Sequence, residues 1–161
     1  MMPSSSREDN IKIILPGSKS IINRILCMAL YHNVDIMIKN FNLCYDVLEM
    51  LAIYDTLHIK YILKEDKLYI YKTEKTTSSD ISISISESGT CLRFVLPYFA
   101  FVFPHKVVIK LGDRLSKRPI SKLIDCLNGA GGDVIQNGNM IKITPPLPPL
   151  KEGGGSPPSL S

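Results

Sequence analysis

The sequence predicts an α/β fold of the α+β type, built from a βαβαββ unit that occurs nearly twice. Three observations favour it. Short strand-like runs alternate with helix-like runs along the 161 residues. A hairpin-like pair of runs follows each of two helix-like segments. The second half of the chain repeats the spacing of the first, and such repetition indicates stacked copies of one structural unit.

The first unit is expected to contain two helices and four strands. Apolar residues recur at helical spacing in both helices, and Asp46 is expected to be the N-cap of the second. A polar turn at residues 64–67 separates the last two strands. In chain order we expect a strand at 11–15, a helix at 20–31, a strand at 34–38, a helix at 46–57, and hairpin strands at 59–63 and 68–71.

The second unit has the same succession of elements. Isoleucine alternates with serine at 81–85, which is typical of a strand buried on one face. Pro97 is expected to kink or shorten the helix after it, and Pro119 to occupy the first turn of the last helix. The elements are expected at 81–85 (strand), 90–101 (helix), 107–111 (strand), 120–127 (helix), and 133–136 with 140–143 (a hairpin around the turn at 137–139).

A shift of 73 residues aligns the two units. One offset serves a helix and both strands of the hairpin, whereas the preceding helix and strand match at offsets about two or three smaller. The aligned pairs are Val47 with Ile120, Leu51 with Ile124, Tyr61 with Val134, Leu68 with Ile141 and Ile70 with Ile143.

The ends of the chain differ in character from its middle. Residues 1–10 are polar, lack the apolar centre of a secretory signal, and are expected to be a disordered start. Residues 145–161 hold six of the eleven prolines and a run of three glycines, so we expect a disordered tail. A single globular part is therefore expected at 11–144, and the apolar run at 94–103 is too short to span a membrane.

Composition narrows the function classes. The 19 Lys and Arg residues exceed the 15 Asp and Glu residues only slightly and form no runs, which favours small anionic ligands over nucleic acid. The four cysteines are far apart, without a CxxC pair or a histidine at metal-ligand spacing. We therefore expect four free thiols, no bound metal and a reduced, cytoplasmic location.

The segment LPGSKSIINR at residues 15–24 places cations at a strand-to-helix turn. It lacks the first glycine of a phosphate-binding P-loop. Lys19 and Arg24, on either side of a helix start, instead suit an anion bound by backbone N–H groups, serine hydroxyls and two cations at the positive end of the helix dipole. From this segment alone, a solvated turn with a serine N-cap remains an equal alternative.

The second unit favours the anion site. Its equivalent turn reads SESGTCLR, with Arg93 one helical turn in and Gly89 permitting close backbone approach to a ligand. The segment GDRLSKRPI then sets Arg114 and Arg118 ahead of another helix. If the units pack side by side, these cationic turns converge on one edge and could bind a ligand with more than one negative group.

These motifs, in this order, resemble the 5-enolpyruvylshikimate-3-phosphate synthase family. The family motifs are LPGSKSxxNR, an S/N-x-G-T-x-x-R loop, and R-x-x-x-R-P-I before a leucine-rich helix and a glycine pair. The resemblance covers about residues 11–144, roughly the first third of such an enzyme. The related UDP-N-acetylglucosamine enolpyruvyl transferases usually read GAKN where this chain reads GSKS at 17–20, so they are the poorer match.

The resemblance implies an inside-out α/β prism, with the βαβαββ unit used three times in each of two domains and substrates bound between them. It implies a transferase of aromatic amino acid biosynthesis, 3-phosphoshikimate 1-carboxyvinyltransferase, which moves the enolpyruvyl group of phosphoenolpyruvate to the 5-hydroxyl of shikimate 3-phosphate. No metal or organic cofactor takes part. Membrane and nucleic acid are not expected partners. The expected partners are the two substrates and a second domain, which is expected to be missing from this chain.

Residue by residue, the resemblance implies a set of substrate contacts. Lys19, Gly89 and Arg118 match positions that bind phosphoenolpyruvate, while Ser20 and Arg24 match positions that hold shikimate 3-phosphate. Two further positions match arginines that are expected to be structural or to contribute to the positive electrostatic field of the site: Arg93 and Arg114.

Two departures from the family pattern leave alternatives open. Glu87 stands where the family commonly has Asn, and a carboxylate beside a phosphate repels it unless the carboxylate is paired or turned away. The acid/base carboxylates that the second domain supplies have no match, so no catalytic residue is assigned. The chain is therefore expected to be either a truncated enolpyruvyl transferase, inactive alone, or a non-catalytic module that binds anions or docks on a partner.

Overall fold

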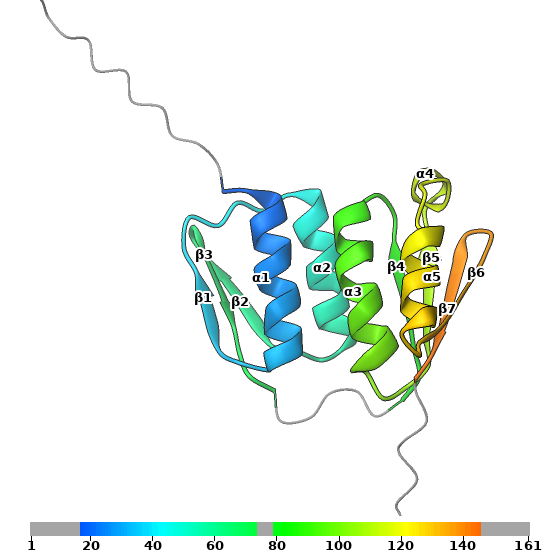
Figure 1. Ribbon diagram of the computed structural model, residues 1–161. Helices are drawn as coiled ribbons and strands as arrows, with labels where there is room; N and C mark the ends of the chain where they lie inside the picture. The colour runs from blue at the N-terminus through cyan, green and yellow to red at the C-terminus, as the bar shows by residue number, and fades with distance from the viewer. Residues whose placement is uncertain (1–16, 74–78, 146–161) are drawn as a thin grey trace, which may run out of the picture.

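Two β-sheets flank a central set of helices in the computed structural model, which describes residues 17–73 and 79–145 (Figure 1). The first unit contributes the helices α1 and α2 and one sheet. Its helices begin where polar turns end, and their buried faces carry the apolar residues at helical spacing. In chain order its elements are α1 (Lys19–His32), β1 (Ile36–Ile38), α2 (Tyr45–Thr56), β2 (Tyr61–Lys64) and β3 (Lys67–Ile70).

The second unit contributes the helices α3, α4 and α5 and the other sheet. Along β4 the isoleucines are buried and the serines exposed, as the alternation predicts. Its elements are β4 (Ile81–Ile85), α3 (Gly89–Phe101), β5 (Val107–Leu111), α4 (Asp113–Ser116), α5 (Ser121–Gly129), β6 (Asp133–Asn137) and β7 (Met140–Thr144).

Three strands of each sheet share one order and one register. One sheet has the order β1-β3-β2 and the other the order β4-β5-β7-β6, in which β5, β7 and β6 are the counterparts of β1, β3 and β2. Met37 of β1 pairs with Tyr69 of β3. In the other sheet Val108, 71 residues after Met37, pairs with Lys142, 73 residues after Tyr69. The hairpins match in the same way, so the repeat is confirmed at the level of individual backbone pairs for the αβαββ part of the unit, which is described in both copies.

The helices α1, α2 and α3 contact one another and supply the centre of the core. Leu26, Met50 and Phe99, one from each helix, are fully buried. Tyr54 of α2 is also fully buried, and its hydroxyl donates a 2.7 Å hydrogen bond to the carbonyl oxygen of Leu26. This bond satisfies the one polar atom that the tyrosine brings into the core and joins α1 to α2.

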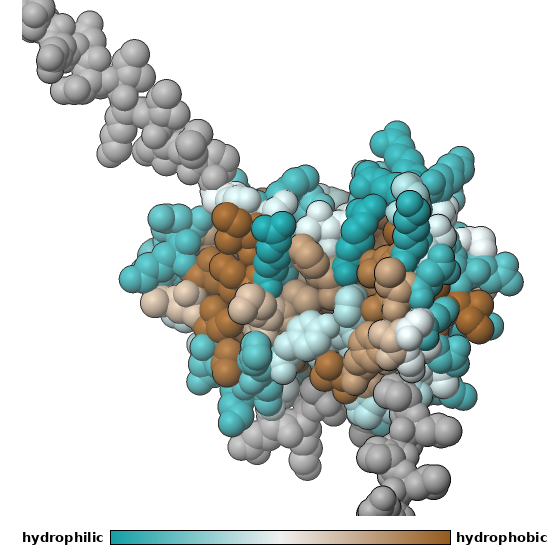
Figure 2. All heavy atoms as spheres, in the orientation of Figure 1, coloured by the Kyte–Doolittle hydropathy of each residue, from teal (hydrophilic) through white to brown (hydrophobic). Residues whose placement is uncertain are grey.

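One side of α1 remains in solvent and is apolar. Figure 2 shows hydrophobic atoms along this helix. Ile21 and Met28 of α1 are both exposed. None of the helices in the described part of the chain is long and apolar enough to cross a membrane.

The structure corrects four details of the expected elements. Cys44, not Asp46, is the N-cap of α2. Asp46 therefore lies inside the first turn, and its carboxylate accepts hydrogen bonds from Lys19 and Ser88 instead of capping its own helix. Pro119 lies before α5 and not in its first turn, because Ile120 is the N-cap. α3 continues through Pro97 to Phe101, so the proline does not shorten the helix.

The fourth detail is a short helix that the sequence did not predict. Residues of the segment GDRLSKRPI form α4, and Arg114 lies inside it instead of in a loop. The expected strand at 11–15, the start at 1–10 and nearly all of the tail at 145–161 lie outside the described residues.

Candidate anion-binding site

The N-terminal ends of α1, α2 and α3 lie at the same end of the molecule, next to α4 and the start of α5 (Figure 1). The first N–H groups of a helix have no partner within the helix, and the helix dipole is positive there. Bringing three such ends together produces a surface that favours negatively charged ligands.

A pocket of about 300 Å³ opens at this end of the molecule. It collects residues that are far apart in the sequence, from the starts of three helices and from the loop before a fourth. Two of them are cations and two are acids, so the pocket is polar with opposed charges. Its lining residues are Lys19, Tyr45, Asp46, Glu87, Gly89, Thr90 and Arg118.

Lys19 and Asp46 form an ion pair in this pocket. The Lys19 Nζ lies 2.9 Å from the Asp46 Oδ2, and the lysine side chain is 61% exposed whereas the aspartate side chain is 21% exposed. The Asp46 carboxylate raises the pKa of Lys19, so the lysine carries its full charge at neutral pH. The hydrogen bond from the Ser88 hydroxyl, followed by that from Lys19, lowers the pKa of Asp46.

A second carboxylate of α2 holds the loop between β4 and α3. The Glu49 side chain is almost fully buried and accepts hydrogen bonds from three successive backbone N–H groups. Its Oε1 accepts from Ser86 and from Glu87, at 3.0 Å for Glu87, and its Oε2 accepts from Ser88 at 2.8 Å. Ser88 in turn donates its hydroxyl to Asp46 Oδ1 at 2.7 Å and caps α3 by accepting from the Cys91 N–H.

Gly89 begins α3 beneath two guanidinium groups. A Cβ at this position would lie 2.8 Å from the Arg93 Nη1 and 2.9 Å from the Arg118 Nη1. Arg93 also donates a 3.2 Å hydrogen bond to the Gly89 carbonyl oxygen. Any side chain here would displace these guanidinium groups, so the absence of a side chain is what brings two cations against the backbone.

The structure brings together all three residues expected to contact phosphoenolpyruvate. Lys19, Gly89 and Arg118 line one pocket, and Arg93 lies against the same glycine. The other expected residues lie outside that pocket's lining. The Arg24 Cζ lies over the Phe94 ring, 5.7 Å from the centroid.

Ser20 and Arg114 are the remaining expected residues. Ser20 is half-buried in the first turn of α1, and Arg114 is exposed on α4. Neither side chain lines the pocket that holds Lys19 and Arg118.

Sequence reasoning missed three functional candidates on α2. Tyr45 and Asp46 line the pocket, and Glu49 lies directly behind it. One signal was available: Asp46 and Glu49 are three residues apart, so both project from the same side of a helix. Another is that Tyr45 and Arg118 occupy equivalent positions at the offset of 73.

The donor set of the pocket suits an anion better than a metal ion. Lysine and arginine are poor metal ligands, and the described residues contain no group of three or more His, Cys, Asp or Glu side chains placed to hold a metal ion. All four cysteines are free thiols, as the sequence predicts. Arginine and lysine, backbone N–H groups and a threonine are the groups that bind phosphate and carboxylate.

Comparisons with known proteins point in one direction. A family model described as EPSP synthase (3-phosphoshikimate 1-carboxyvinyltransferase) matches residues 6–152. The 3-phosphoshikimate 1-carboxyvinyltransferase of Buchnera aphidicola subsp. Cinara cedri is 31% identical over 148 residues, which cover 89% of this chain and 33% of that protein. That of Pseudoalteromonas translucida is 29% identical over 155 residues, 91% of this chain and 34% of that protein.

A solved structure agrees in fold. The EPSP synthase from Acinetobacter baumannii superimposes with a TM-score of 0.71 at 18% identity, over 83% of this chain and 32% of that one. The chain thus spans about a third of the length of the relatives that it matches.

Proposed function

The chain belongs to the EPSP synthase family, and on that basis we propose that its pocket forms part of the site at which such an enzyme binds phosphoenolpyruvate and shikimate 3-phosphate. In this proposal the complete enzyme transfers the enolpyruvyl group of the first substrate to the 5-hydroxyl of the second. The 161 residues supply one wall of the site, and groups from a second domain supply the rest.

One observation carries the proposal. Lys19 belongs to the first unit and Arg118 to the second, yet both line the same pocket at the start of α3. Two cations and the free N–H groups of a helix start can hold a ligand that carries both a phosphate and a carboxylate. Phosphoenolpyruvate is a ligand of that chemistry.

The cations also meet the chemical need of the reaction. Joining two highly anionic molecules requires that their charges be held close and in a fixed geometry. Preorganised cations offset this repulsion and stabilise charge in the tetrahedral intermediate without rearranging during the reaction. In this scheme Lys19, Gly89 and Arg118 act on phosphoenolpyruvate.

The second substrate is assigned to the neighbouring turn of α1. Ser20 and Arg24 bind shikimate 3-phosphate in this proposal; both lie in the first two turns of α1, four residues apart. The Arg24 guanidinium carbon lies over the Phe94 ring, and a guanidinium held by an aromatic face can still donate its N–H groups to a phosphate.

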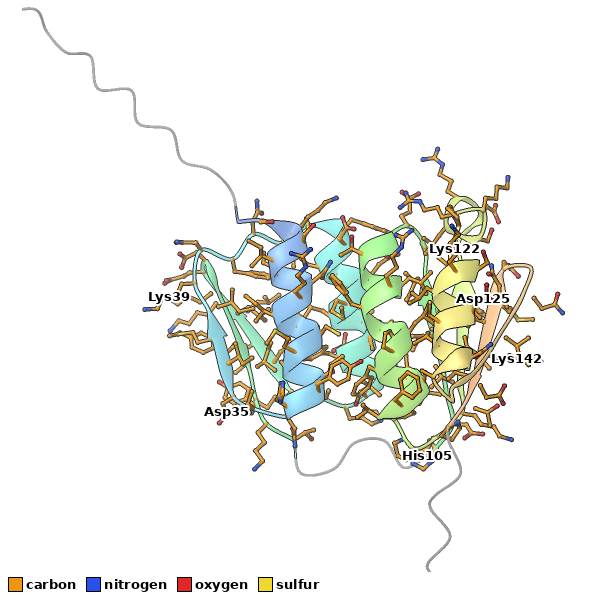
Figure 3. The ribbon with its side chains drawn as sticks, in the orientation of Figure 1. Asp35, Lys39, His105, Lys122, Asp125 and Lys142 are labelled. Atoms are coloured by element: carbon orange, nitrogen blue, oxygen red, sulfur yellow. The ribbon has the colours of Figure 1, made fainter. Side chains whose placement is uncertain are left out.

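Isothermal titration of the full 161-residue chain with phosphoenolpyruvate at low ionic strength tests the proposal. We expect weak, salt-sensitive binding, since exposed charges are screened as salt rises. Arg118→Ala should weaken it by about tenfold or more, because a charge-assisted contact is lost. As a control, Lys122→Ala removes a cation that lies on α5 outside the pocket (Figure 3).

The results separate the two functions that the sequence leaves open. Binding of phosphoenolpyruvate or shikimate 3-phosphate with no comparable heat from sulfate supports the substrate site. Equal binding of all three anions supports a general anion-binding module instead. No heat from the wild-type chain at millimolar concentrations of any of them contradicts both.

A further inference from the structure

Glu49 has an unusual environment for a carboxylate. It is 8% exposed and forms no ion pair among the described residues, yet it accepts three N–H groups from the β4–α3 loop. A buried carboxylate without a cation is costly unless hydrogen bonds satisfy its oxygens. Here the three loop N–H groups satisfy both carboxylate oxygens, so Glu49 and the loop are bonded to each other.

The loop is held from its other side as well. A Cβ on Gly112, which follows β5, would collide with the Ser86 backbone, at 2.9 Å from its Cα. The Gly112 N–H also donates a 3.0 Å bond to the Ile85 carbonyl oxygen. The β4–α3 loop is therefore fixed between Glu49 and the backbone at the start of α4.

The position of the loop determines how close the start of α3 lies to the cations. Ser88 is followed directly by Gly89. The Arg93 and Arg118 guanidinium groups lie so close to that glycine that a Cβ on it would be 2.8 Å and 2.9 Å from their Nη1 atoms. A shift of the loop would move the glycine backbone away from both groups. The pocket geometry thus depends on a residue that does not line it.

We propose that Glu49 is a positioning residue: by accepting the Ser86, Glu87 and Ser88 N–H groups, it holds the start of α3 where Arg118 and Lys19 can bind an anion. The inference rests on the proposed anion site and adds the residue that presets it. Glu49 touches no ligand in this scheme and acts only through the loop.

The test compares three variants of the full chain by titration with phosphoenolpyruvate. Glu49→Gln keeps the size of the side chain, but its amide can accept at only one atom, so at least one loop N–H loses its acceptor. Asp125→Asn removes an equal charge from an exposed position on α5 (Figure 3). Ile53→Val removes a buried methyl group from α2 and so lowers stability without touching the loop.

We expect Glu49→Gln to weaken binding about tenfold, and both controls to bind like the wild type. A purely structural role predicts that Glu49→Gln behaves like Ile53→Val, with a lower unfolding temperature and unchanged affinity, and that result overturns the inference. If the wild-type chain binds no phosphoenolpyruvate, the proposed function fails instead.

Hydrogen exchange on the wild-type chain keeps the test independent of how well the variant folds. The amides of Ser86, Glu87 and Ser88 should be protected to the same degree as amides in the middle of α3, although they lie in a loop. Rapid exchange at these three positions would show that Glu49 does not hold them and would also overturn the inference.

Discussion

The Lys19 Nζ lies 2.9 Å from the Asp46 Oδ2, so a cation expected to meet a substrate already has a counter-ion in the free protein. The same carboxylate accepts the Ser88 hydroxyl through its other oxygen. Asp46 therefore connects the starts of α1 and α3, the two places where the repeated units contribute to the pocket.

Asp46 should make the stability of the chain depend on acid pH. Its pKa is lowered in the folded state, so its contribution is complete above the unfolded value of about 3.9 and is lost as pH falls through the folded pKa. Thermal unfolding of the wild type and of Asp46→Asn between pH 6 and pH 2 measures this. The difference between the two should shrink below pH 4, and a constant difference would contradict the assignment.

Replacing Lys19 by Gln should separate binding from stability. The lysine is well exposed, and an exposed ion pair contributes little to folding, so the unfolding temperature should change only slightly. Affinity for phosphoenolpyruvate should nevertheless fall about tenfold, because one of the two pocket cations is removed. Calorimetry and thermal unfolding on the same sample give both values.

Two glycines should respond differently to the same substitution. In Gly89→Ala the new Cβ meets the flexible ends of two arginines, which can move away, so the chain should fold normally and lose anion affinity. In Gly112→Ala the Cβ meets the Ser86 backbone, which cannot move without shifting the loop. We expect a loss of about 2 kcal/mol or more in the free energy of unfolding for Gly112→Ala, measured with urea.

Tyr54→Phe should affect stability alone. The tyrosine hydroxyl donates to the Leu26 carbonyl oxygen in the core, and its removal should lower the free energy of unfolding by about 1 kcal/mol. Tyr54 does not line the pocket at the helix starts. Affinity for phosphoenolpyruvate should stay at the wild-type value, and a loss of affinity would indicate coupling through α2 that the contacts do not suggest.

The four thiols should react in a fixed order with a disulfide reagent at neutral pH. Cys126 is exposed and should react first, followed by the half-buried Cys44. Burial raises the pKa of Cys27 to about 11 and raises that of Cys91 further, so neither forms a thiolate readily. These two should react only when the chain unfolds, and rapid reaction of all four would contradict the described core.

Much of the fold follows from local patterns in the sequence. The alternation of Ile81, Ile83 and Ile85 predicted a strand buried on one face, and the structure confirms it. The 73-residue offset predicted the equivalence of the two hairpins, and their registers agree pair by pair. These features are predictable because side-chain period and turn chemistry act over a few residues.

The site was predicted in part. Lys19, Gly89 and Arg118 stand in or beside cationic turns, and the family resemblance assigned them to one substrate; the structure places them around one pocket. Asp46 was expected only to cap its own helix, and Glu49 drew no attention. Their partners are 27 to 42 residues away, a separation across which no local pattern operates.

By itself the sequence determined the repeat, the order of the described helices and strands except α4, the family and the cationic character of the helix starts. Only the tertiary structure decided which of those cations share a pocket, that Lys19 is paired with Asp46, and that Glu49 anchors the loop before Gly89. The physical reason is the sequence separation over which each kind of interaction acts. Helix and strand formation is governed by neighbours in sequence, whereas hydrogen bonds and ion pairs form between whatever groups the packed core brings within about 3 Å.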